Sequence, residues 1–123
     1  EMDLEGAKAL IANGCKGVFE GANMPLTPEA IAAVQGAGLM YSPGKASNAG
    51  GVATSGLEMT QNSMRLSWSF EEVDEKLQGI MKNIFHAAYD ASVEVGKPGD
   101  LMVGANVAGF LKVAAAMMAQ GVV

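Results

Sequence analysis

The sequence predicts an α/β fold: part of a doubly wound parallel sheet, followed by helices. Two short strand candidates, at residues 17–20 and 39–41, flank a segment with clear helix signals. Strand, helix and strand at this spacing form a parallel crossover unit. From residue 50 onward the apolar residues recur at helical spacing, so only helices are predicted there.

The first part of the chain contains two predicted helices. Residues 3–12 suit a short helix that ends at Asn13 and Gly14. A second helix is expected after Thr27, because threonine is a favourable N-cap residue and Pro28 fits the first helical position. This helix should end near residue 35, before a run of glycine and alanine.

Two short parallel strands do not make a stable sheet, because parallel sheets need several strands with both faces covered. The chain also begins with Glu1 rather than with methionine, and its first residues already favour a helix. We therefore expect this sequence to be a piece of a longer protein.

Three helices are expected in the second part of the chain. The first spans about residues 51–66. The second begins at a capping box formed by Ser69 and Glu72 and ends at the Gly-Lys-Pro-Gly run of residues 96–99. The last covers about residues 102–119 and is apolar on nearly every side, with Lys112 as its only charge. A central lysine argues against a membrane span, so we expect a buried helix of a soluble protein.

The composition is that of a globular protein, with 50% hydrophobic and 17% charged residues. A net charge of −5 argues against a nucleic-acid partner, because phosphate contacts need a clustered basic surface. Cys15 is the only cysteine, which excludes an internal disulfide and favours a reducing cytoplasm. We expect neither a nucleic-acid nor a membrane partner.

Two asparagines follow the two predicted strands. Asn23 lies in the turn after the first strand, and Asn48 follows the second. Ligands of doubly wound sheets bind beyond the carboxyl ends of the strands, which makes both amides candidate cofactor contacts. The alternative is an ordinary turn with Asn23 in a left-handed conformation.

The stretch NAGGVATSGLEM, at residues 48–59, begins a predicted helix with small residues and hydroxyls. Such a helix start suits a carboxylate or phosphate, and Asn48 can cap it or donate to a ligand. Val52 and Ser55 share a helical face and could grip one polar group of a substrate. The alternative is that the Ser55 hydroxyl is satisfied by its own helix backbone.

Other candidate chemistry has ordinary explanations. His86, the only histidine, is expected on the polar surface of its helix. The sequence has no cluster with metal-ligand spacing, no Gly-x-Gly-x-x-Gly motif, and no credible general acid or base. We therefore predict neither a catalytic residue nor a metal site in this chain.

Three stretches carry a resemblance to a known family: EGANMP at residues 20–25, PGKASNAGGVATSGLEMTQN at 43–62, and GANVAGFLKVAAAMMAQG at 104–121. In order and along nearly the whole chain, they resemble the carboxyl-terminal part of bacterial hexameric glutamate dehydrogenases. The resemblance implies that residues 1–48 end an NAD(P)-binding Rossmann-like domain. Residues 49–123 would then return in helices across the cleft toward the substrate domain.

The resemblance also implies roles for single residues. Asn23 and Asn48 would lie near the nicotinamide of NADP or NAD, and both cofactors stay open. Val52 and Ser55 would line the amino-acid pocket, with the Ser55 hydroxyl bonding the distal carboxylate of glutamate. Ser47 departs from the pattern, because alanine is expected there.

The parent enzyme implied by the resemblance is a homo-hexamer that converts L-glutamate to 2-oxoglutarate and ammonium, reversibly. Its catalytic lysine and aspartate belong to sequence upstream of this chain, so the chain alone is expected to be inactive. Leucine, phenylalanine and valine dehydrogenases share the Asn-Ala-Gly-Gly turn and form one alternative. A helical interaction module without catalysis forms the other.

Overall fold

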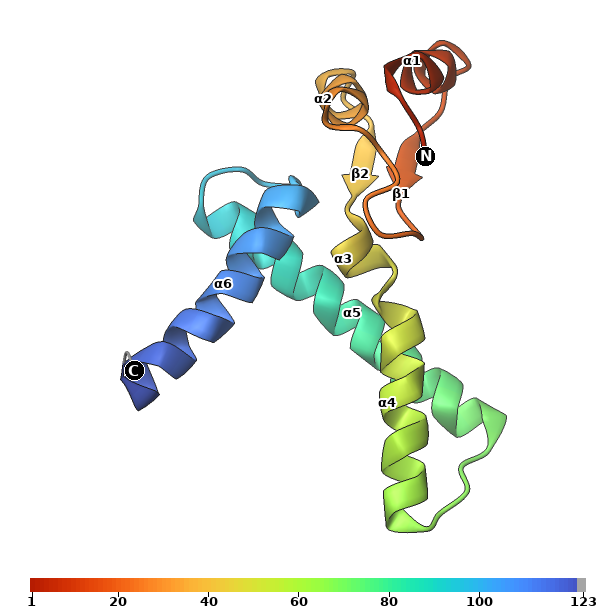
Figure 1. Cartoon of the computed structure of the whole chain (residues 1–123), viewed down its shortest axis with the longest axis vertical. Helices are drawn as coiled ribbons and strands as arrows, with labels where there is room; N and C mark the ends of the chain where they lie inside the picture. The colour runs from red at the N-terminus through yellow and green to blue at the C-terminus, as the bar shows by residue number, and fades with distance from the viewer. Residues whose placement is uncertain (122–123) are drawn as a thin grey trace.

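The structure is a computed structural model that describes residues 1–121. Its amino-terminal part is a small α/β unit and the remainder is helical (Figure 1). The α/β unit consists of α1 (Leu4–Ala12), β1 (Gly17–Phe19), α2 (Pro28–Gly36) and β2 (Met40–Ser42). The two strands pair in parallel, with Val18 opposite Tyr41, which confirms the predicted crossover.

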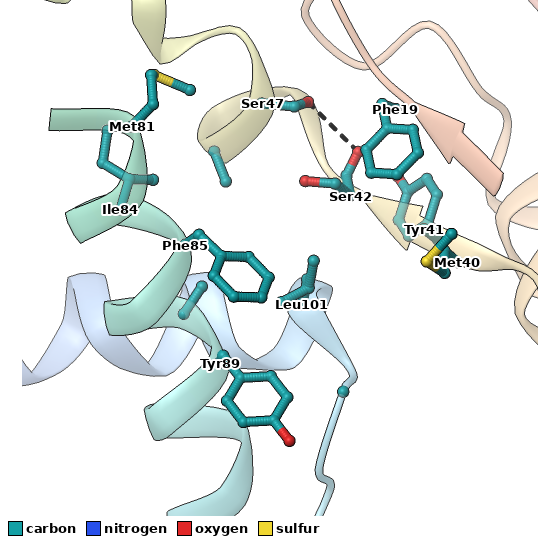
Figure 2. A pocket seen from close by; sticks show the side chains of 13 residues that line it. Phe19, Met40, Tyr41, Ser42, Ser47, Met81, Ile84, Phe85, Tyr89 and Leu101 are labelled. Carbon is teal, nitrogen blue, oxygen red and sulfur yellow. Dashed lines mark hydrogen bonds between the residues drawn. The ribbon is translucent and has the colours of Figure 1, made fainter. Parts of the chain in front are cut away.

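One face of this sheet is covered and the other is open. Residues on the covered face pack against α1 and α2 in the core, which contains Ala7, Leu26, Ala30, Val34 and Tyr41. Because side chains alternate along a strand, Phe19 and Met40 point to the opposite face. They are 60% and 62% exposed, and Figure 2 shows them beside an apolar groove.

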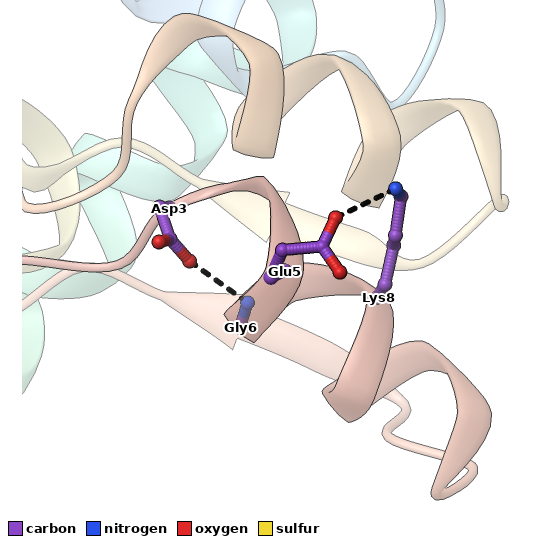
Figure 3. A network of polar contacts seen from close by, with 4 residues as sticks. All are labelled: Asp3, Glu5, Gly6 and Lys8. Atoms are coloured by element: carbon purple, nitrogen blue, oxygen red, sulfur yellow. Dashed lines mark hydrogen bonds and ion pairs between the residues drawn. The ribbon is translucent and has the colours of Figure 1, made fainter.

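Side-chain caps begin the helices at the predicted positions. Thr27 accepts a hydrogen bond from the Ala30 amide, and Ser69 forms the expected capping box with Glu72. The start of α1 is fixed in the same way (Figure 3), since Asp3 accepts from the Gly6 amide at 2.9 Å. In the following turn, Lys8 pairs with Glu5 on the surface.

The helical part contains α3 (Gly44–Ser47), α4 (Ala49–Met64), α5 (Phe70–Glu94) and α6 (Leu101–Gln120). The four-residue α3 was not predicted, because one helical turn leaves no periodicity in the sequence. The helix expected at residues 51–66 begins and ends two residues earlier, since Arg65 takes a left-handed conformation. The second strand lies one residue later than the expected 39–41.

The long helix α5 is the scaffold of the helical part, with α4 and α6 both packed against it (Figure 1). Helices α5 and α6 approach closely where Gly104 meets Ala88. The absence of a side chain at Gly104 permits this approach, since a Cβ there would overlap the Ala88 carbonyl oxygen. The turn between them is held by Ser92, which is fully buried and accepts from the Gly99 amide at 3.1 Å.

Helix α6 departs from the expectation of a buried helix. Only Gly104 of this helix is buried, and large side chains such as Phe110, Val113 and Met118 are exposed. The reason is that α6 meets α5 mainly near its own amino-terminal end, so its later turns extend away (Figure 1). By length and composition alone, Leu101–Gln120 could also cross a membrane.

Replacing Gly104 with alanine tests the close helix crossing. We expect Gly104→Ala to lower the free energy of unfolding by about 1–3 kcal/mol, because the added methyl group forces α5 and α6 apart. Gly109→Ala is the matched control: it lies on the same helix, has open space around it, and should be neutral or stabilise by up to about 1 kcal/mol. Urea unfolding measures both. Equal effects would contradict the crossing.

Candidate functional site

The candidate site lies where the two strands end. β1 stops at Phe19 rather than at the predicted residue 20, and Glu20 turns its buried carboxylate toward the chain that leaves β2. Glu20 Oε2 accepts a hydrogen bond from the Gly44 amide at 2.7 Å. Gly44 has no side chain to separate the two segments, and a Cβ there would overlap the Ala22 carbonyl oxygen.

The structure brings the two predicted asparagines together. Asn48 Nδ2 donates to Asn23 Oδ1 at 2.8 Å, which confirms that both side chains lie at the same edge of the sheet. Asn48 precedes α4 but does not cap it, because its side-chain amide is turned to Asn23. The left-handed residue of the first loop is Met24, with φ of 51°, and not Asn23.

Ser47 adds a second tie between the two segments. Its hydroxyl lies 2.5 Å from the Glu20 carbonyl oxygen, to which it donates. The Pro43 carbonyl oxygen lies 3.1 Å from the same hydroxyl. The position where the family resemblance leads one to expect alanine therefore holds a group that joins the loop after β1 to the end of α3.

Val52 and Ser55 lie together on an exposed side of α4. Val52 is 74% exposed, and by helical spacing both residues lie opposite Gly50, which faces Leu77 and Met81 of α5. Ser55 Oγ is 3.3 Å from the Gly51 carbonyl oxygen, the backbone bond that the alternative interpretation anticipated. A hydroxyl is a rotor, however, and can turn its hydrogen toward a ligand.

Glu20 and Tyr41 form a buried pair that the sequence did not reveal. Both line a cavity of about 610 Å³ together with Asn23 and Lys45. Glu20 Oε1 and Tyr41 Oη have no hydrogen-bond partner among residues 1–121. Burial, followed by the neighbouring Glu20 carboxylate, raises the pKa of the Tyr41 hydroxyl above its ordinary range.

A separate apolar groove of about 360 Å³ lies between the open face of the sheet and α5. Figure 2 shows Phe19 and Met40 on the sheet side, facing Phe85 and Tyr89 of α5, with Leu101 between. Sequence reasoning missed this groove because its walls come from segments far apart in the chain.

The remaining candidates have no place in the site. His86 is exposed on α5 and contacts the ring of Phe85 edge-on, as expected for a surface histidine. Within residues 1–121, no group of three or more His, Cys, Asp or Glu side chains is arranged to hold a metal ion.

The parallel strands and the amides gathered where they end define an α/β protein whose candidate site lies at the carboxyl edge of its sheet. The chain belongs to the Glutamate/Leucine/Phenylalanine/Valine dehydrogenase family, whose model matches residues 1–121. Along all 123 residues it is 60% identical to the glutamate dehydrogenase of Bacteroides thetaiotaomicron. It is 56% identical to the NADP-specific glutamate dehydrogenase of Escherichia coli.

Solved structures show the same fold. The crystal structure of Plasmodium falciparum glutamate dehydrogenase superposes with a TM-score of 0.94 at 50% identity, over 99% of this chain and 26% of that one. A hetero-hexameric glutamate dehydrogenase from Thermus thermophilus superposes with a TM-score of 0.88 at 29% identity, over 99% of this chain and 28% of that one. The chain spans 28% of the Bacteroides relative and 27% of the Escherichia coli relative.

The raised pKa of Tyr41 predicts a loss of stability in alkali. The unfolded state releases the tyrosine proton from about pH 10 upward, whereas the folded state retains it, so the free energy of unfolding falls as the pH rises past that value. Tyr41→Phe removes this contribution, and its stability should fall less steeply above pH 10. Unfolding curves at pH 8 to 11 measure the difference; parallel curves for the two proteins would contradict the assignment.

Proposed function

We propose that this chain is the carboxyl-terminal part of an NAD(P)-dependent glutamate dehydrogenase of the cytoplasm. The proposal rests chiefly on the 60% identity to a glutamate dehydrogenase along the whole chain. In the proposed reaction, a hydride leaves Cα of L-glutamate for NAD or NADP, and water converts the resulting imine to 2-oxoglutarate and ammonium.

In this proposal, residues 1–48 complete the Rossmann-like cofactor domain and the asparagine pair contacts the nicotinamide. The Asn48 to Asn23 bond leaves the Asn23 Nδ2 donors and the Asn48 Oδ1 acceptor without a hydrogen bond to any residue from 1 to 121. A primary carboxamide offers one acceptor and two donors, so it complements what the pair has left. The nicotinamide carboxamide has this chemistry.

The substrate side is assigned to Val52 and Ser55, at the start of the helices that residues 49–123 contribute. Both are exposed on the side of α4 that α5 does not cover, so a ligand can reach them. An aliphatic wall beside a short neutral donor suits a carboxylate whose charge is neutralised by a cation elsewhere. We assign the distal carboxylate of glutamate to the Ser55 hydroxyl.

The exposed apolar surface of α6 is assigned to protein contacts in the complete enzyme, which we propose to be a homo-hexamer. Phe110, Val113 and Met117 share one face of the helix and provide this surface, and Lys112 lies on the opposite face near the middle of the helix. A lysine at the centre of a spanning segment is costly in a bilayer, which favours a protein contact over a lipid one.

Turnover should require residues outside this chain. We expect the full-length protein to reduce NAD or NADP in the presence of L-glutamate, measured by absorbance of the reduced cofactor. The purified chain 1–123 should show no turnover, because neither a catalytic acid nor a base is predicted in it. A full-length protein without glutamate-dependent reduction of the cofactor would refute the proposed activity. Turnover by the isolated chain would refute the proposal that the catalytic residues lie outside it.

Replacing Ser55 in the full-length enzyme tests the substrate assignment. Ser55→Ala should lower kcat/KM for glutamate by about 10- to 100-fold, the loss expected for a hydrogen bond to a charged group. Preference should move toward uncharged amino acids such as leucine. Thr60→Ala is the control, since that hydroxyl bonds only the Gly56 carbonyl oxygen of its own helix. Intact glutamate preference in Ser55→Ala would remove Ser55 from the pocket.

A further inference from the structure

We propose that Glu20 is a positioning residue that sets how Asn23 and Asn48 face the cofactor. This inference rests on the proposed function, in which those two asparagines contact the nicotinamide. Glu20 itself touches neither substrate nor cofactor in this arrangement. It acts by holding the two segments that carry the asparagines.

Glu20 makes three bonds to the end of β2 and to the segment that follows it. Its amide donates to the Ser42 carbonyl oxygen at 3.1 Å, and its carbonyl oxygen accepts from Ser47 Oγ at 2.5 Å. Its carboxylate oxygen Oε2 accepts from the Gly44 amide at 2.7 Å. The residue is only 5% exposed, so these bonds are shielded from competing water.

These bonds lie next to the asparagines along the chain. Asn23 lies three positions after Glu20, and Asn48 directly follows Ser47. The bond between the two asparagines is itself exposed and joins neutral groups, so water competes with it. A buried bond to a carboxylate is stronger, which makes Glu20 the tie that fixes the spacing of the pair.

The contact between Glu20 and Gly44 should affect the placement of the cofactor and not the binding of glutamate. Hydride transfer depends closely on the placement of the two reacting carbons, and the nicotinamide is placed by the asparagines in this proposal. Val52 and Ser55 lie further along, on the exposed side of α4, and have no hydrogen bond to Glu20 within residues 1–121. Loss of the tie should therefore affect the cofactor and spare glutamate binding.

The test uses the full-length enzyme with Glu20→Ala, Glu20→Gln and Glu20→Asp. Glu20→Ala should raise the KM for the cofactor about tenfold, the effect of losing one charge-assisted bond, with the KM for glutamate unchanged. The primary isotope effect with glutamate deuterated at Cα should increase, because hydride transfer becomes slower. Glu20→Gln should raise the cofactor KM less than Glu20→Ala does, since its amide oxygen can still accept from the Gly44 amide but without the carboxylate charge.

The controls are Glu29→Ala, which removes an exposed carboxylate of α2, and Thr60→Ala, which removes an exposed hydroxyl of α4. Neither should change the cofactor KM or the isotope effect. An unchanged cofactor KM in Glu20→Ala would overturn the proposal, as would a folded Glu20→Gln variant as impaired as Glu20→Ala. If Glu20→Ala does not fold, Glu20→Asp decides, because its side chain is one methylene too short to keep the bond from the Gly44 amide: a cofactor KM raised about tenfold supports the tie, and an unchanged one refutes it.

A structural measurement separates this inference from the proposed activity. A wild-type enzyme without glutamate-dependent turnover would refute the activity alone. A crystal structure of the full-length Glu20→Ala variant, or of Glu20→Asp, would still test the tie. Separation of Asn23 Oδ1 from Asn48 Nδ2 beyond hydrogen-bond distance supports it, and retention of the 2.8 Å bond contradicts it.

Discussion

The hydrogen bond from the Gly44 amide to the buried Glu20 carboxylate is the interaction on which the candidate site depends. Two strands of three residues offer little pairing of their own, and the chain segments that leave them must still meet at one edge. The carboxylate joins these segments across 24 residues of sequence, and the absence of a side chain at Gly44 lets the backbones come close enough. Without that contact, the segments that carry Asn23 and Asn48 would be joined here only by the bonds of the Glu20 backbone and by the exposed bond between the two asparagines.

The helical part extends this edge into a surface. Helix α3 leads within one residue into α4, so the asparagine edge and the exposed side of α4 belong to one continuous stretch of chain. α5 supports that stretch from behind through Leu77 and Met81, which face Gly50. The crossing at Gly104 in turn fixes α6 on α5. Gly44 thus permits a close backbone approach at the candidate site, and Gly104 permits one between the two helices α5 and α6 that support it.

The sequence predicted most of the elements because their signals are local. Thr27, Ser69 and the Gly-Lys-Pro-Gly turn mark helix ends through contacts within a few residues, and the structure confirms them. The carboxylate of Glu20, the hydroxyl of Ser47 and the apolar groove were missed because each depends on a partner far away in the chain. Burial of α6 was wrongly expected because apolar composition shows that a helix seeks a partner, not which segment supplies it. The expectation that Asn23 and Asn48 both leave the carboxyl edge of the sheet was correct, because parallel strands bring their carboxyl ends to one edge.

Because Asn48 directly precedes α4, this helix sets the distance between Asn48 and Ser55. Asn48 precedes its first turn and Ser55 lies seven positions later, which corresponds to roughly 10 Å along the axis at the α-helical rise. In the proposed enzyme, this rise would separate the point that holds the nicotinamide from the point that holds the far end of the amino acid. Side-chain length would then be measured by the backbone of a helix, so that a dicarboxylic amino acid one methylene shorter spans too little of the interval. Inserting one residue between the two points would rotate Ser55 by about 100° away from the pocket.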